Sequence, residues 1–125
     1  MSRPNPIPAA VLDVICLCAQ WCGTCSDYAS RFGQIGQAFP QVRFIWIDIE
    51  DEADLVDPVE VENFPTILIA RGGQPIFFGP ILPHVETLER LVRNALSDDQ
   101  PRAWSEPTVL GLMARLQRSG RTGRA

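Results

Sequence analysis

The stretch Trp21-Cys22-Gly23-Thr24-Cys25 decides the fold of this chain because of the segments on either side of it. The preceding segment, Val11 to Ala19, is almost entirely apolar, as is typical of a strand buried on both faces of a sheet. The following segment, Ser26 to Phe39, has the apolar periodicity of a helix and is closed by Pro40. A C-x-x-C motif between a strand and a helix indicates a thiol–disulfide redox site.

The two cysteines of this motif lie at the first turn of the expected helix. They can close a small disulfide there, and the unpaired N–H groups of the turn stabilise a thiolate. We therefore expect Cys22 to be the exposed attacking thiol and Cys25 to be the resolving thiol. Zinc sites use the same spacing, so the motif by itself does not decide between the two chemistries.

Apolar and β-branched runs further along the chain predict three more strands and one more core helix. Arg71-Gly72-Gly73-Gln74 predicts a hairpin turn between two of these strands. The expected elements are strands at Val42 to Ile49, Asn63 to Ala70 and Pro75 to Phe78, a short helix with loops within Glu50 to Glu62, and a helix at His84 to Leu96.

Taken in order, these segments resemble the thioredoxin family. The resemblance extends from about Val11 to Leu96, which is most of the chain. It implies an α/β, thioredoxin-like fold, three-layer α/β/α with a mixed central sheet, here lacking the usual N-terminal strand and helix. The residues that carry it are Ala19-Gln20-Trp21-Cys22-Gly23 with Cys25, Asp48, Phe64-Pro65-Thr66, Gly72-Gly73 and Phe77-Phe78-Gly79.

The resemblance also implies that the Phe64–Pro65 peptide bond is cis and that Pro65 lies against the C-x-x-C motif. The backbone of Phe64 would then offer an edge onto which a substrate peptide adds like a short β-strand. We expect Trp21 beside the motif to be a flat, partly exposed platform for substrate. The expected substrate-binding residues are Trp21, Gly23, Thr24, Phe64 and Pro65.

Two departures from the family pattern bear on activity. Thr24 stands where many thioredoxins have proline, a position that alters redox poise across the family. Cys16 stands in the place of a buried aspartate that assists proton transfer to and from the resolving thiol. The protein is therefore expected to lack the usual buried general base, so attack by Cys25 should be slower unless water or Cys16 substitutes.

Three interpretations of Cys16 and Cys18 are open. Both lie on one strand, two residues apart, so both side chains point to the same face. They are either small buried hydrophobes, members of a relay in which Cys16 exchanges with Cys25, or ligands of a four-thiolate metal site with Cys22 and Cys25. The first interpretation is favoured because unligated cysteine is among the most buried residue types.

Length and charge limit the classes of protein to which this chain can belong. Its 125 residues fit a single core, and a net charge of −4 gives no basic surface for nucleic acid. No apolar run approaches the roughly 20 residues of a membrane helix. The proline-containing segment at residues 1–8 is unlike a secretory signal, so the expected compartment is cytoplasmic, where the thiols are kept largely reduced.

The chain is expected to consist of one domain followed by three further parts. Residues 1–96 form the expected thioredoxin-like domain, with its core at 11–96, and residues 97–106 are a polar linker. Pro107 to Arg118 has the periodicity of an amphipathic helix, and residues 119–125 are expected to be a disordered basic tail. The helix either covers the sheet face left bare by the missing N-terminal helix, or docks a partner or a second copy of the chain.

The function that follows is a protein-disulfide reductase of the thioredoxin-like type, active in cell redox homeostasis and electron transport. It would reduce protein or small-molecule disulfides through a mixed disulfide on Cys22 that Cys25 resolves, without a cofactor or metal. Its expected partners are disulfide-containing proteins and an upstream reductase, with neither nucleic acid nor membrane. The alternative is a non-catalytic binding or chaperone module that keeps the fold and the peptide-binding edge.

Overall fold

The computed structural model describes residues 12–19, 21–98 and 100–119. These residues form four strands and four helices in the order that the sequence predicts. The elements are β1 (Leu12–Cys18), α1 (Gly23–Ala38), β2 (Val42–Asp48), α2 (Ala53–Val56), β3 (Thr66–Arg71), β4 (Gln74–Pro80), α3 (Val85–Ser97) and α4 (Pro107–Arg118). The N-terminal segment and the basic tail from residue 120 onward lie outside the described residues.

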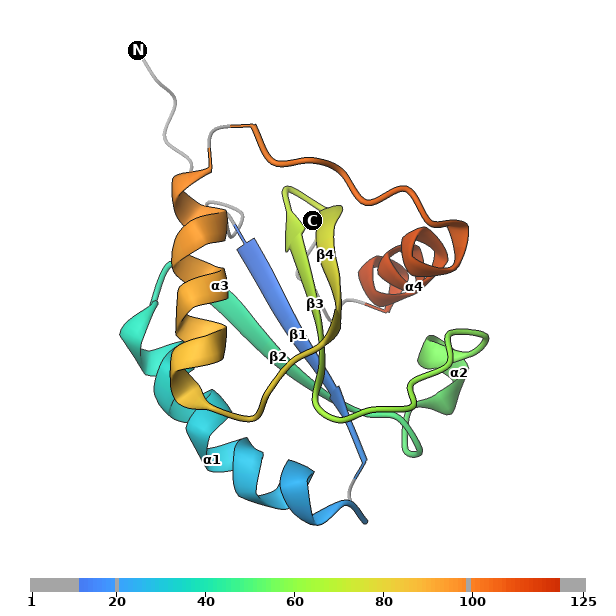
Figure 1. Cartoon of the computed structure of the whole chain (residues 1–125). Coiled ribbons are helices and arrows are strands. Elements are labelled where there is room, and N and C mark those ends of the chain that lie inside the picture. Colours follow the sequence, from blue (N-terminus) through green and yellow to red (C-terminus); the bar gives the residue numbers. More distant parts are fainter. Residues whose placement is uncertain (1–11, 20, 99, 120–125) are drawn as a thin grey trace.

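The four strands form one mixed sheet in the order β2-β1-β3-β4. Strand β1 is parallel to β2 and antiparallel to β3, and β3 forms a hairpin with β4. Helices α1 and α3 cover one face of the sheet, and α4 covers the other (Figure 1). The expected three-layer α/β/α fold is thereby confirmed. Residues 1–11 lie outside the described part of the chain, so the expected lack of an N-terminal strand and helix stays a prediction.

The central position of β1 explains its apolar sequence. All seven of its residues are buried because β2 and β3 flank it and helices cover both of its faces. Successive side chains of a strand point to opposite faces of the sheet, so those of β1 alternate between two separate cores. Val14 and Cys16 belong to the core beneath α1 and α3, whereas Ile15 and Leu17 belong to the core beneath α4.

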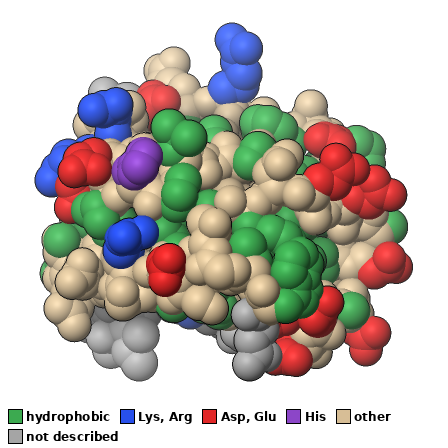
Figure 2. Space-filling view, turned by 60° about the horizontal axis from the view of Figure 1, so that its bottom comes forward, with side chains coloured by type: hydrophobic (Ala, Val, Ile, Leu, Met, Phe, Trp, Pro, Cys, Tyr) green, Lys and Arg blue, Asp and Glu red, His purple; other side chains and the backbone are tan. Residues whose placement is uncertain are grey.

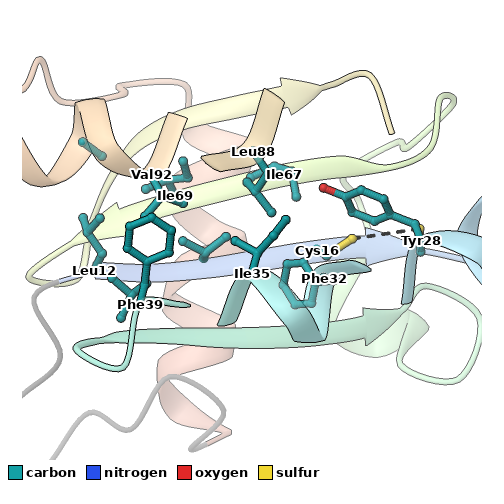
Figure 3. Close-up of a cluster of buried hydrophobic side chains, with 14 of the residues drawn as sticks. Leu12, Cys16, Tyr28, Phe32, Ile35, Phe39, Ile67, Ile69, Leu88 and Val92 are labelled. Atoms are coloured by element: carbon teal, nitrogen blue, oxygen red, sulfur yellow. Dashed lines mark hydrogen bonds between the residues drawn. The ribbon is translucent and has the colours of Figure 1, made fainter. Parts of the chain in front are cut away.

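The larger core lies between the sheet and the pair α1 and α3. Figure 3 shows side chains of both helices meeting those of β1 and β3. A Cβ on Gly36 of α1 would lie 3.4 Å from the ring of Phe44 on β2, which is ordinary van der Waals contact, so the packing of helix on strand does not require glycine there. The core is formed mainly by Leu12, Tyr28, Phe32, Ile35, Phe39, Ile67, Ile69, Leu88 and Val92.

The second core is closed by α4, whose residues Val109, Leu112, Met113 and Leu116 are buried against the sheet. The segment leading to α4 follows β4, where the Trp104 N–H donates to the carbonyl oxygen of Pro75 at 2.8 Å. On the other side, Arg115 Nε donates to the carbonyl oxygen of Leu55 at 2.6 Å. This burial favours the first interpretation of the helix, since docking a second copy through this face would require α4 to leave the sheet.

Element boundaries differ from the expected ones where the C-x-x-C motif meets α1. The helix begins at Gly23, not at Ser26, because Thr24 and Cys25 already have helical geometry and only Cys22 remains extended. The hairpin turn uses Gly72 and Gly73 at φ values of 59° and 86°, which L side chains rarely adopt. No helix in the described part of the chain has both the length and the apolar character needed to cross a membrane.

Asp13 is the one carboxyl side chain of β1, and it is buried. Its Oδ1 atom lies 3.6 Å from Arg43 Nε and accepts no hydrogen bond from any described residue. Burial raises the pKa of the Asp13 carboxyl to about 6, and the charge of Arg43 opposes this rise only in part. The folded protein therefore holds a proton on Asp13 at pH values where the unfolded chain, with a carboxyl pKa of 3.8, has released it.

Asp13→Asn is expected to stabilise the protein increasingly as the pH rises. In the wild type, the contribution of Asp13 to the free energy of unfolding is lost between about pH 4 and about pH 7, by at most about 3 kcal/mol. Asparagine does not titrate, so the variant should escape this loss. Urea unfolding of both proteins at several pH values measures the difference. The exposed Asp27→Asn variant is the control, and a pH-independent effect of Asp13→Asn would contradict the prediction.

Candidate functional site

The C-x-x-C motif lies at the carboxyl end of β1, where the chain turns into α1. Cys22 is the N-cap residue of α1 and is half-buried, with an extended backbone at φ −86° and ψ 124°. Its N–H donates to the carbonyl oxygen of Ala19 at 3.0 Å, and its own carbonyl oxygen accepts from Ser26 N–H at 3.1 Å. Cys22 thus lies at the N-terminus of α1, which is the positive end of the helix dipole, and its side chain makes no capping hydrogen bond with the described residues.

Cys25 is bonded to Cys18 in this structure, whereas the motif predicts a bond to Cys22. The disulfide joins the last residue of β1 to the first turn of α1, with a Cα–Cα distance of 5.7 Å. Both cysteines are almost fully buried, and Cys22 remains a free thiol. The Ala19 N–H also donates to Cys25 Sγ at 3.3 Å. The expected description of Cys18 as a plain buried hydrophobe is therefore incomplete.

Cys16 is a free, fully buried thiol whose Sγ lies 4.0 Å from Cys18 Sγ. Burial raises the pKa of the Cys16 thiol far above its ordinary value, so it is protonated at neutral pH and a poor base. Cys25 is bonded to Cys18. A disulfide between Cys16 and Cys25, which the relay interpretation would require, is not observed. The sulfurs of Cys18 and Cys25 are bonded to each other and are not free to bind zinc in this state.

Trp21 and Phe64 lie together beside the motif, although they are far apart in sequence. Trp21 is 65% exposed, and its ring meets that of Phe64 edge to face at 5.7 Å. Trp21 Nε1 donates to Glu50 Oε2 at 2.8 Å. Glu50 is positioned by Asp48, whose Oδ1 accepts from the Glu50 N–H at 2.9 Å. No signal in the sequence selects Glu50, which lies within the acidic segment after β2.

The other expected substrate-binding residues surround this pair. Gly23 and Thr24 are exposed on the first turn of α1, and Pro65 is buried just before β3. The Phe64–Pro65 peptide bond is cis, as the resemblance implied. A second cis bond, Asp57–Pro58, had no signal in the sequence. The motif end of the molecule faces the viewer in Figure 2, where apolar side chains lie beside a group of acidic ones.

A hollow of about 380 Å³ lies next to the disulfide, between α1 and β2. Cys25 forms part of its lining, although the residue is almost fully buried. Two carboxylates, Asp48 and Asp51, form one wall, and the ring of Trp46 forms another. The hollow is lined by Ala19, Cys25, Ser26, Ala29, Trp46, Asp48 and Asp51.

The arrangement of these residues agrees with comparisons to known proteins. The thioredoxin family model matches residues 9–81, which is more than half of the chain. The chain belongs to the thioredoxin family. This membership accounts for the cis Phe64–Pro65 bond and for the mixed sheet with helices on both faces.

Individual thioredoxins are similar over parts of their length. The chain is 26% identical to thioredoxin Asp f 28 of Aspergillus fumigatus over 76 residues, which cover 61% of this chain and 70% of that one. It is 35% identical to mitochondrial thioredoxin-3 of Saccharomyces cerevisiae over 63 residues, half of each chain. The crystal structure of thioredoxin from Trypanosoma brucei brucei superposes with a TM-score of 0.63 and 28% identity, covering 71% of this chain and 78% of that one.

Proposed function

We propose that this protein is a thiol–disulfide oxidoreductase that reduces disulfides through a mixed disulfide on Cys22. The observation that carries the proposal is a free, half-exposed thiol at the N-cap of α1, in a chain of the thioredoxin family. Helix N–H groups at this position stabilise the thiolate, which is the nucleophile in disulfide exchange. Cys25 lies on the first turn of the same helix and is the proposed resolving thiol.

The reaction transfers two electrons from the protein to the substrate. The Cys22 thiolate attacks one sulfur of the substrate disulfide, and the other substrate sulfur leaves as a thiolate that takes a proton from water. The Cys25 thiolate then attacks Cys22 Sγ, closes the Cys22–Cys25 disulfide and releases the second substrate thiol. This step requires Cys25 to be reduced beforehand, so the Cys18–Cys25 bond must be absent at the start of the cycle.

The substrate surface is proposed to consist of Trp21, Gly23, Thr24, Phe64 and Pro65. The exposed ring of Trp21 offers a flat apolar contact, held in place by Phe64 on one side and Glu50 on another. Extended protein segments are the proposed occupants because they can add to the backbone at Phe64 like a short strand. Carboxylates at Asp48 and Asp51 favour substrates with basic side chains next to the disulfide.

The resolving step is proposed to lack a strong buried base. Cys16 occupies the position of the family aspartate, and its thiol keeps its proton at neutral pH because burial raises its pKa. The proposed acceptors of the Cys25 proton are solvent water and the Asp48 and Asp51 carboxylates, which line the hollow beside Cys25. We propose a cytoplasmic compartment and an upstream reductase that returns the protein to its dithiol form, both of which rest on the sequence.

Reduction of insulin by dithiothreitol, with and without the protein, tests this function. Catalytic amounts of the protein should raise the initial rate of insulin reduction several-fold over the uncatalysed reaction. A rate equal to that of the uncatalysed reaction would favour the alternative, a binding or chaperone module that keeps the fold. The measurement should begin with fully reduced protein, because Cys25 is otherwise occupied by Cys18.

A further inference from the structure

Cys25 has two cysteines with which it can form a disulfide. Cys22 precedes it by three residues at the N-cap of α1, and Cys18 lies at the end of β1 with a Cα–Cα distance of 5.7 Å. That distance is typical of disulfide-bonded cysteines, so the backbone already accommodates the Cys18–Cys25 pair. The two pairs exclude each other because they share one sulfur. Whichever forms decides whether Cys22 is free.

We propose that Cys18 is a third redox-active thiol. It displaces Cys22 from its disulfide with Cys25, so that the resulting Cys18–Cys25 disulfide lies in the protein interior. The inference rests on the proposed function for the origin of the Cys22–Cys25 disulfide. The Cys18–Cys25 pairing itself rests on the structure. Oxidised protein would then carry a buried disulfide together with a free, half-exposed Cys22 thiol.

The step is an internal disulfide exchange without net oxidation or reduction. The Cys18 thiol loses its proton to water, and its sulfur attacks Cys25 Sγ. The Cys18–Cys25 bond forms, the Cys22–Cys25 bond breaks, and the Cys22 sulfur leaves with the bonding electron pair. The released Cys22 thiolate takes up a proton from water and becomes the free thiol. The two electrons removed from the protein earlier stay with the reduced substrate.

The surroundings of the three sulfur atoms favour this direction. The leaving sulfur, Cys22, is at the N-terminus of α1, where the helix dipole stabilises its charge. The attacking sulfur, Cys18, accepts a hydrogen bond from the Cys16 thiol at 4.0 Å. Because burial keeps Cys16 protonated, that donor is present while charge develops on Cys18. The product also places an uncharged disulfide in the core and leaves the polar thiol at the surface.

The exchange would change what Cys22 can do. A free Cys22 can still attack a substrate disulfide, but the mixed disulfide that results has no Cys25 thiol to resolve it. Oxidised protein would therefore retain its partner covalently until a reductant opens the Cys18–Cys25 bond. Reduced protein would instead release the substrate in the ordinary way. The redox state of Cys18 thus selects between turnover and retention of the bound partner.

Disulfide mapping of the full chain tests the pairing directly. Reduced protein is oxidised with diamide, quenched with acid after increasing times, alkylated with N-ethylmaleimide and digested with chymotrypsin. Cleavage after Trp21 separates Cys18 from the C-x-x-C motif, so a Cys18–Cys25 bond links two peptides, whereas Cys22–Cys25 stays within one. We expect Cys22–Cys25 at early times and mainly Cys18–Cys25 with alkylated Cys22 at late times.

Two serine variants of neighbouring thiols on β1 provide the comparison. Cys18→Ser should keep the Cys22–Cys25 disulfide at all times, with Cys22 protected from alkylation. Cys16→Ser, which retains a hydrogen-bond donor, should map like the wild type. Two results for the wild type at late times would each overturn the inference, whatever the variants show. One is a Cys22–Cys25 disulfide with alkylated Cys18, and the other is the absence of any internal disulfide. If Cys18–Cys25 forms but insulin is reduced no faster than by dithiothreitol alone, the proposed function fails and the pairing stands.

Discussion

Cys22→Ser is expected to lose insulin reduction by roughly three orders of magnitude or more, the scale seen when the nucleophile of a covalent mechanism is removed. A serine hydroxyl at the N-cap of α1 stays protonated and cannot form a mixed disulfide. The fold should be kept, because Cys22 takes no part in the buried disulfide and is half-exposed. Initial rates with limiting protein and excess dithiothreitol measure the loss.

Cys25→Ser is the matched control for this variant. Cys22 stays in place there, so the protein should still attack substrate but accumulate as a mixed disulfide that non-reducing electrophoresis detects. Adduct formation with Cys25→Ser and none with Cys22→Ser would assign the two roles. Substantial insulin reduction by Cys22→Ser would mean that another thiol is the nucleophile and that the assignment of Cys22 is wrong.

Replacing both Leu112 and Leu116 by alanine is expected to remove most of the stability of the protein. Both side chains are fully buried between α4 and the sheet, and each Leu→Ala change in a core costs about 2–5 kcal/mol. The sum is comparable to the 5–15 kcal/mol by which small proteins are typically stable. Urea unfolding of the double variant should therefore begin at or near zero denaturant.

Leu110→Ala makes the same chemical change on the outer side of the same helix. Leu110 is 37% exposed, so its truncation should cost well under about 1 kcal/mol. Wild-type stability in the double variant would instead indicate that α4 docks a partner. Dimerisation through the apolar face of α4 would also make the unfolding midpoint rise with protein concentration, whereas a helix that covers its own sheet predicts no such rise.

The order of the elements could be predicted because its signals are local. The apolar run that became β1, the glycine pair of the β3–β4 hairpin and the helical spacing in α4 each depend on neighbouring residues. Helix α4 spans Pro107–Arg118, as its periodicity predicts, since Pro107 suits the first helical turn. The cis bond before Pro65 came from the family resemblance alone, because the residues near it carry no local signal.

The partner of Cys25 could not be predicted, because it depends on where β1 ends relative to α1. The sequence indicated which face of β1 Cys18 occupies, but not that the turn after Ala19 brings Cys25 within bonding distance. Glu50 was missed for a similar reason, since its contact with Trp21 joins two loops at the same end of the sheet. Asp13 lies on the same face of β1 as Ile15 and Leu17, and its lack of a hydrogen bond to Oδ1 from any described residue depends on the packing around it, which alternation along a single strand does not predict.

Synthesis from the N-terminus delivers α4 after all four strands have been made. The sheet face that α4 covers, which includes Ile15, Leu17, Ile47 and Leu68, therefore stays open to solvent on the nascent chain. At translation rates of about 5–20 residues per second, this interval lasts a few seconds. For that time the growing polypeptide presents an apolar surface to molecular chaperones, and its escape from aggregation depends on how soon the final helix leaves the ribosome.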